Sequence, residues 1–259
     1  MRIDHYLVEQ GFIATRAKAQ DAIREGRVCV NSAVITKNSY QLKDTDRVEL
    51  QQAALSFVSR AGFKLYDVLD DFSIKLKNRI CIDVGASTGG FSDVCLKQGA
   101  SKVYAVDVGT DQLDSTLRKE AKLICMEQMN ARHLNKEMFD ELPDFACMDV
   151  SFISVKHILP ALKDIMSNVE MVVLVKPQFE AGKEHIGKHG IIKDKKVHVQ
   201  VLKDMLSYVQ ELGLFVHHIQ GSSILGRDGN KEFVMHVKQE PKAQLFDIKK
   251  IVEEDHTKR

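Results

Sequence analysis

The sequence predicts an α/β protein, in which a mostly parallel sheet with an antiparallel last strand follows a small N-terminal α+β domain. Strand and helix patterns alternate from Arg79 onward, which is typical of βαβ units and of a sheet covered on both sides. The first 50 residues instead combine two short helical patterns with short strands. The last two strand patterns are joined by residues 225–230, which leave no room for a helix, so these strands should pair antiparallel.

Length and composition indicate a folded protein of two domains. The 259 residues suffice for a small domain beside a medium-sized one, and 44% hydrophobic and 28% charged residues are typical of a globular protein. The formal net charge of +1 excludes a polycation that coats nucleic acid, so any nucleic-acid site must be local. We expect domains at residues 1–50 and 59–238, a connector at 51–58 and a C-terminal tail at 239–259.

Neither a membrane segment nor a metal site is expected. No apolar run approaches the roughly 18 residues that span a bilayer, and the N-terminus lacks the apolar stretch of a signal peptide. We therefore expect a cytoplasmic protein without a membrane partner. The five cysteines are widely spaced and show no CxxC or Cys/His spacing, so we interpret them as buried free thiols and expect no bound metal.

The N-terminal domain should contain two short helices followed by strands. Ile3 and Leu7 fall on one helical face, and Thr15 is a suitable N-cap for a second helix that Gly26 ends. Strands are expected at residues 28–30 and 46–50, with a turn at 31–32.

The larger domain should alternate strands and helices up to its last two strands. Strand patterns cover residues 79–84, 102–106, 122–126, 145–149, 171–176, 214–220 and 232–237. Helical patterns cover residues 91–97, 112–119, 155–166 and 195–212.

A glycine-rich segment, Asp83–Phe91, lies between the first strand and the first helix of this sheet and predicts a cofactor site. Its expected cofactor contacts are Asp83, Gly85, Ser87, Gly89, Gly90 and Phe91. Asp107 ends the next strand, where a carboxylate can accept both ribose hydroxyls of an adenosyl ligand, which leaves NAD and S-adenosylmethionine open. The segment opens with Asp instead of GxGxxG. This favours S-adenosylmethionine, which has no pyrophosphate to bind and whose ammonium group prefers a nearby carboxylate.

Charged residues converge on the edge of the sheet where its parallel strands end. Asp149 and Lys176 close two strands, and Glu232 opens the antiparallel last strand at the same edge, so a catalytic site is predicted there. Asp149 is also expected to border the cofactor. A neighbouring cation such as Lys64, which precedes the first strand, would favour the neutral amine of Lys176, while Asp149 and Glu232 would orient it. Such an amine can remove the proton of an alcohol, for example a ribose 2′-hydroxyl.

At these residues the chain resembles the hemolysin A (TlyA) family of rRNA 2′-O-ribose methyltransferases, which have an FtsJ-like catalytic domain. The resemblance implies a Rossmann-like methyltransferase sheet and a Lys-Asp-Lys-Glu catalytic tetrad at Lys64, Asp149, Lys176 and Glu232. The first 50 residues are similar to the α-L RNA-binding module, which implies ribosomal RNA or ribosomal subunits as partners and cytidine as the target. The resemblance extends to about Val237 and rests on Arg2–Asp4, Ala14–Arg16, Ser59–Leu65, Asp83–Phe91, Met148–Ser154, Val175–Glu180 and Gly187–Gly190.

Basic residues in two parts of the chain are candidates for RNA contacts. Residues 176–203 hold seven lysines against three acidic residues and directly follow the predicted base, so this segment should border the active site. In the N-terminal domain the alternative is a solvated helix whose charges are balanced by Asp21 and Glu25. The expected RNA-binding residues are Arg16, Lys18, Arg24, Arg27, Arg60 and Lys188.

Three other functions are compatible with parts of the sequence. Methylation of a base is disfavoured, because no Asn-Pro-Pro loop follows the strand of Asp149 and no cysteine lies beside the site. A non-catalytic ribosome-binding or assembly factor would keep the fold without binding a cofactor. A haemolysin has no physical support in the sequence. The modified nucleotide, the ribosomal subunit and the oligomeric state stay open.

Overall fold

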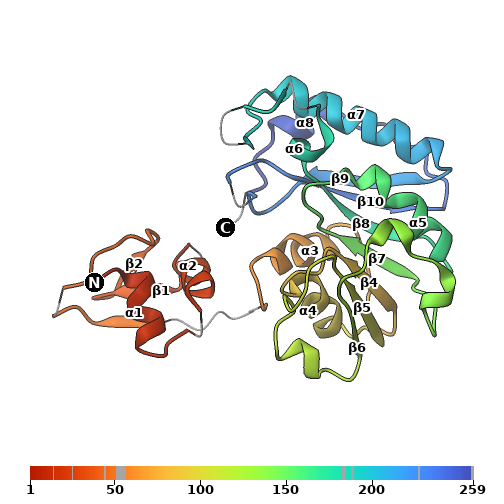
Figure 1. Ribbon diagram of the computed structural model, residues 1–259. Helices are drawn as coiled ribbons and strands as arrows, with labels where there is room; N and C mark the ends of the chain where they lie inside the picture. Colours follow the sequence, from red (N-terminus) through yellow and green to blue (C-terminus); the bar gives the residue numbers. More distant parts are fainter. Residues whose placement is uncertain are drawn as a thin grey trace. The chain divides into compact units, whose positions relative to one another are not determined.

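The computed structural model divides the chain into two compact units, Met1–Arg60 and Ala61–Lys258 (Figure 1). The structure describes residues 1–13, 15–24, 26–43, 45–50, 57–182, 185–187, 190–226 and 228–257. Most of the predicted connector, residues 51–56, and the predicted RNA-binding residue Lys188 therefore lie outside the described residues.

The N-terminal unit is a small α+β fold, as predicted. Its elements are α1 (Ile3–Glu9), α2 (Arg16–Arg24), β1 (Val28–Val30), β2 (Ala33–Ile35) and β3 (Val48–Leu50). The strands form an antiparallel sheet in the order β2-β1-β3, and α1 and α2 bury Ile3, Leu7 and Ile23 in its core. The strand β2 was not predicted. It follows a two-residue turn in which Asn31 and Ser32 both have positive φ angles, of 51° and 67°, as a tight hairpin requires.

The larger unit is built around a seven-stranded sheet in the order β6-β5-β4-β7-β8-β10-β9. Neighbouring strands from β6 to β8 are parallel, whereas β10 is antiparallel to both β8 and β9, which confirms the predicted fold class. The strands are β4 (Ile80–Val84), β5 (Lys102–Val106), β6 (Leu123–Met126), β7 (Phe145–Met148), β8 (Glu170–Val175), β9 (Phe215–Gly221) and β10 (Phe233–Lys238). The α-helices are α3 (Ala61–Leu69), α4 (Gly90–Lys97), α5 (Leu159–Ile165), α6 (Pro177–Glu180), α7 (Lys195–Glu211) and α8 (Ile248–Glu253).

Helices cover both faces of this sheet because successive strand residues point to opposite sides. Ile82 and Val84 of β4 belong to a core that includes residues of α5, α7 and α8, for example Leu162 and Leu202. The helices α3 and α4 contact each other beside β4 and β5 (Figure 1). The C-terminal helix α8 buries Ile248 and Val252 in the same core, so residues 248–253 are part of the fold, whereas the sequence predicted at most a frayed terminal helix in this tail.

Two predicted helices are shorter than expected for identifiable reasons. The helix expected at 112–119 is reduced to a 3₁₀ turn at Leu117–Lys119, because the carboxylate of Glu127 accepts the backbone N–H groups of Asp111, Gln112 and Leu113. These amides are thus engaged by a side chain outside the segment. The helix expected at 155–166 is a 3₁₀ turn followed by α5, whose first turn contains a proline that has no N–H to donate.

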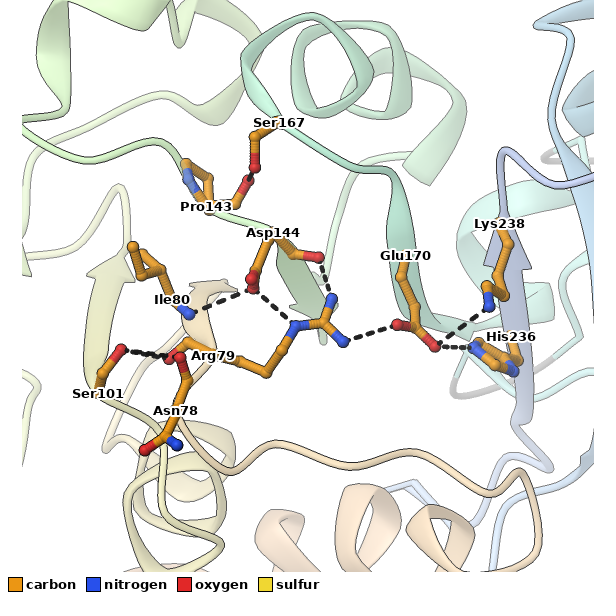
Figure 2. Close-up of polar contacts among 10 residues, drawn as sticks. All are labelled: Asn78, Arg79, Ile80, Ser101, Pro143, Asp144, Ser167, Glu170, His236 and Lys238. Atoms are coloured by element: carbon orange, nitrogen blue, oxygen red, sulfur yellow. Dashed lines mark hydrogen bonds and ion pairs between the residues drawn. The ribbon is translucent and has the colours of Figure 1, made fainter.

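A polar network lies at the edge of the sheet where β4, β7 and β8 begin, the opposite edge from the predicted site (Figure 2). Arg79 donates from Nε to Oδ1 of Asp144 and from Nη1 to Oε2 of Glu170, both at 2.8 Å. The other oxygen of Glu170 lies 2.9 Å from Nε2 of His236. Burial alone would raise the pKa of Glu170, but His236 and Arg79 outweigh it and lower this pKa to about 2. The network ties β8 and β10 to the start of β4.

All five cysteines are free, as predicted, but one of them is not buried. Cys125 is exposed on β6, which is an edge strand, whereas the other four are buried. None of the helices in the described parts of the chain is long and apolar enough to cross a membrane.

Candidate active site

The structure brings four charged side chains together at the edge where the parallel strands end. Asp149 follows β7, Lys176 follows β8, Glu232 precedes β10, and Lys64 comes from α3. The ammonium of Lys64 lies 2.7 Å from Oε2 of Glu232 and 3.4 Å from Oδ2 of Asp149. Oδ1 of Asp149 lies 2.5 Å from Nζ of Lys176. These four residues are the ones that the sequence singled out.

The cluster is largely withdrawn from water, and its charges stabilise one another. Burial alone would lower the pKa of Lys64, but Asp149 and Glu232 outweigh it and raise this pKa. Burial would likewise raise the pKa of Asp149, whereas Lys64 and Lys176 lower it. Lys64 is therefore a cation and Asp149 an anion near neutral pH.

The arrangement of the two lysines differs from the prediction. We expected Lys64 to act on Lys176 as a neighbouring cation, with both carboxylates orienting Lys176. Asp149 instead lies between the two ammonium groups and contacts both. Of the two lysines, Glu232 contacts only Lys64. Lys64 and Lys176 share the carboxylate of Asp149, one on each of its oxygens. The influence of Lys64 on Lys176 thus passes through Asp149.

Two residues beside the cluster were not predicted as site residues. Lys176 donates from Nζ to Oγ of Ser151 at 2.9 Å, so its ammonium has a hydroxyl partner besides Asp149. The next residue, Phe152, is 92% exposed and has a φ angle of +66°. An exposed aromatic ring in a left-handed backbone conformation is unusual away from functional sites. The sequence shows only that Ser151 and Phe152 lie two and three residues after Asp149, and this position alone does not predict an exposed ring.

The glycine-rich segment forms a tight turn next to Asp149. Gly85 has a φ angle of +81°, and a Cβ atom there would lie 2.6 Å from the carbonyl oxygen of Asp149. Gly89, with φ of +92°, is covered by the side chains of Leu113 and Leu117, and Gly90 begins α4. Phe91, predicted as a cofactor contact, is only 3% exposed, so its ring belongs to the interior.

Two carboxylates flank this turn in different environments. Asp107 accepts the backbone N–H groups of Ser87 at 2.8 Å and Gly109 at 2.7 Å, one on each oxygen. Asp83 is 1% exposed, and its Oδ2 accepts from both the N–H and the hydroxyl of Ser92. Burial raises the pKa of Asp83 to about 7, although the hydrogen bonds from Ser92 oppose this rise. Its Oδ1 is buried without a hydrogen-bond partner among the described residues.

Comparison with known proteins places this site in a family. Residues 57–239 match the model of the FtsJ-like methyltransferases, and residues 1–48 match that of the S4 domain. The chain belongs to the FtsJ-like methyltransferase family. Hemolysin A of Brachyspira hyodysenteriae is 43% identical to it over 91% of this chain and 99% of that protein.

Two other relatives of this FtsJ-like methyltransferase cover both of its units. The 16S/23S rRNA (cytidine-2′-O)-methyltransferase TlyA of Mycobacterium tuberculosis is 35% identical over 90% of this chain and 88% of its own. A solved structure of a Streptococcus thermophilus protein, described provisionally as a hemolysin, has 40% identity and a TM-score of 0.76. It covers 97% of this chain and 94% of that one. The resemblance to the TlyA family expected from the sequence is therefore confirmed.

In the S4 unit of this FtsJ-like methyltransferase, a buried carboxylate accepts hydrogen bonds from two arginine side chains. Asp4 is fully buried and accepts hydrogen bonds of 3.0 Å from Arg2, Arg16 and Gln20. Burial alone would raise the pKa of Asp4, but these partners lower it far below its usual range. Both arginines stay partly exposed, with 39% and 51% of their side chains accessible. The buried carboxylate thus fixes two guanidinium groups at the surface.

The other predicted RNA contacts of the S4 unit lie near Asp21. Arg24 and Arg60 form ion pairs with Asp21 at 3.4 Å and 3.8 Å, so part of the positive charge is balanced, as in the alternative considered from the sequence. Lys18 lies on α2, whereas Arg27 follows Gly26 beyond the end of this helix. This agrees with the prediction from the sequence that Gly26 ends the helix.

Proposed function

We propose that the protein transfers the methyl group of S-adenosylmethionine to the ribose 2′-hydroxyl of a cytidine in ribosomal RNA, within the cytoplasm. The single observation that carries this proposal is the cluster of Lys64, Asp149, Lys176 and Glu232 beside a glycine-rich turn. The relative from Mycobacterium tuberculosis, named as a cytidine-2′-O-methyltransferase of 16S and 23S rRNA, supports the target.

The residues around the glycine-rich turn fit a cationic adenosyl ligand. The carboxylates of Asp149 and Asp107 add to the rise in the pKa of Asp83, which indicates an accumulation of negative charge. The sulfonium and ammonium groups of S-adenosylmethionine would balance this negative charge. Asp107 keeps free lone pairs for the ribose hydroxyls, and Gly85 lets the backbone approach closely. When bound, S-adenosylmethionine supplies an electrophilic methyl group.

In this proposal Lys176 is the base that takes the proton of the 2′-hydroxyl. Asp149 and Ser151 hold the nitrogen of Lys176 in place. Lys64 forms an ion pair with each of the two carboxylates, Asp149 and Glu232. Proton removal by a positioned base contributes about 10²–10⁴-fold to the rate, and orientation of the two reacting groups contributes further. The exposed ring of Phe152 offers a surface on which the base of an unstacked nucleotide can lie.

Methylation of ribosomal subunits from a strain that lacks the protein tests the function. The expected product is 2′-O-methylcytidine, mapped to a nucleotide by mass spectrometry of RNA fragments. A methyl group on a base atom would contradict the proposal, and so would the absence of cofactor binding, which the assembly-factor alternative requires.

Cofactor binding should depend on pH through Asp83. Because its pKa is about 7, this carboxyl is largely protonated below that pH, and a cationic ligand favours the ionised form. We therefore expect the affinity for S-adenosylmethionine to rise from about pH 6 to about pH 8, by at most about tenfold per pH unit below the pKa. Calorimetry should show proton release near pH 6. Asp83→Asn should bind more weakly and without this pH dependence; an unchanged pH profile in that variant would contradict the assignment.

Arg16 should contribute to RNA binding mainly through phosphate. We expect Arg16→Ala to weaken binding to RNA of different sequences to a similar degree and to reduce the slope of log K against log salt by about 1. Asp4 keeps Arg2 and Gln20 in this variant, so the S4 unit should stay folded. The matched control is Lys37→Ala, at an exposed lysine of the same unit outside the predicted set. Equal slopes for the two variants would count against a specific role of Arg16.

A further inference from the structure

The loop that leaves β7 carries two groups of the site and is held in an unfavourable conformation. Ser151 accepts from the ammonium of Lys176, and the side chain of Phe152 is exposed. The φ angle of +66° at Phe152 lies in the left-handed region, which is unfavourable for a residue other than glycine. Such a conformation persists only where surrounding contacts fix it.

Those contacts come from one short helix, α6, which directly follows Lys176. Glu180, the last residue of α6, accepts from the hydroxyl of Ser154 at 2.5 Å and from the backbone N–H of Val155 at 2.9 Å, one on each carboxylate oxygen. The ring centroid of the preceding residue, Phe179, lies 5.2 Å from that of Phe152. The loop is therefore held at both of its ends by residues from one helical turn.

Glu180 contacts this loop through hydrogen bonds, while Lys156 and His157 act on its charge from beyond ion-pair distance among the described residues. Burial raises the pKa of Glu180, although Ser154 and Val155 oppose the rise. In the described parts of the chain no lysine, arginine or histidine lies within ion-pair distance of it. A carboxylate removed from water is costly unless its oxygens are hydrogen-bonded, and both acceptors of Glu180 are used on the loop.

We propose that Glu180 is a positioning residue of the methyl-transfer site. It fixes residues 151–155 so that Ser151 stays on Lys176 and Phe152 faces the substrate nucleotide. The inference rests on the proposed function in so far as it concerns the nucleotide. Because α6 begins immediately after Lys176, Glu180 links residues 151–155 to the backbone segment that carries the base. This link fixes the distance between Lys176 and the loop.

A double-mutant cycle tests whether Glu180 acts through Phe152. Glu180→Ala should lower kcat/KM for RNA by about 10–100-fold, the size expected for a misplacement of about 1 Å, while cofactor affinity stays unchanged. Glu180→Gln keeps an acceptor for Val155 and should retain most of the activity. If both residues act on the same loop, the double variant Glu180→Ala/Phe152→Ala should have a kcat/KM only slightly below that of the more impaired single variant. Losses that multiply, or full activity of Glu180→Ala, would overturn the proposal.

Hydrogen exchange provides a readout that does not depend on methyl transfer. The amide of Val155 should exchange faster in Glu180→Ala than in the wild type, with other peptides of the unit unchanged. Glu211→Ala, at an exposed glutamate of α7, is the matched control and should leave this amide protected. Unchanged protection in Glu180→Ala would overturn the support role whatever the activity. Methylation of a base atom by the wild-type protein would instead overturn the proposed function. Hydrogen exchange at Val155 would still test the role of Glu180 in that case.

Discussion

Replacing Lys176 by alanine should abolish methyl transfer to RNA while leaving S-adenosylmethionine binding intact. The variant removes the proposed base, and the loss should be at least the roughly 10²–10⁴-fold that a positioned base provides. Asp149 keeps its contact with Lys64 at 3.4 Å, so the variant should leave no isolated buried charge and should fold. Single-turnover methylation and calorimetry with the cofactor measure the two properties separately.

A second variant separates the role of a base from that of a positive charge. Lys176→Arg keeps the cation next to Asp149, but a guanidinium group does not lose its proton in proteins. This variant should therefore be as inactive as Lys176→Ala. Lys249→Ala, at an exposed lysine of α8 outside the predicted RNA-contact segments, is the control and should be fully active. An active Lys176→Arg enzyme would mean that a cation, and not a base, is required at this position.

Replacing Arg79 by methionine should destabilise the larger unit by about 1.5–3 kcal/mol, the contribution typical of hydrogen bonds to charged groups. Arg79 is 20% exposed and Glu170 12%, and without Arg79 the carboxylate of Glu170 keeps only His236 at 2.9 Å and Lys238 at 4.0 Å as cationic neighbours in the described structure (Figure 2). Denaturant unfolding followed by circular dichroism measures the change. The control is Lys250→Met, whose ion pair with Glu254 is exposed at 71% and 42% and should contribute at most about 1 kcal/mol.

The same network should govern stability in acid. The pKa of Glu170 is lowered to about 2 in the folded protein, below its unfolded value of about 4.3, so its stabilising effect is complete above the unfolded pKa. It is lost as the pH falls toward 2. Arg79→Met should therefore lose less stability than the wild type between about pH 5 and pH 2. Parallel stability curves for the two proteins would show that Arg79 does not set the pKa of Glu170.

The sheet and most of the charged cluster could be predicted because they depend on local patterns. Asp149, Lys176 and Glu232 lie at strand ends, and strand direction alone brings strand ends to one edge. Lys64 was different, because α3 precedes the first strand and periodicity does not say which edge the helix reaches. The resemblance to a family supplied that residue.

Other features depend on contacts between distant residues, which no local pattern reveals. Glu127 accepts the backbone amides of residues 111–113 and removes a helix that periodicity predicted. Arg79 and Glu170 are 91 residues apart, so their pairing becomes visible only when the strand order is known. Phe152 was missed because an aromatic residue next to a strand is usually buried, and its exposure depends on the support from Glu180 and Phe179.

The ion pair between Lys64 and Glu232 joins residues that are 168 positions apart in the chain. A polypeptide emerging from the ribosome exposes α3 early, whereas β10 is among the last elements to be made. Until β10 has inserted between β8 and β9, Lys64 lacks its closest partner and the cluster is incomplete. In the proposed function, the site is therefore complete only once β10 is in place.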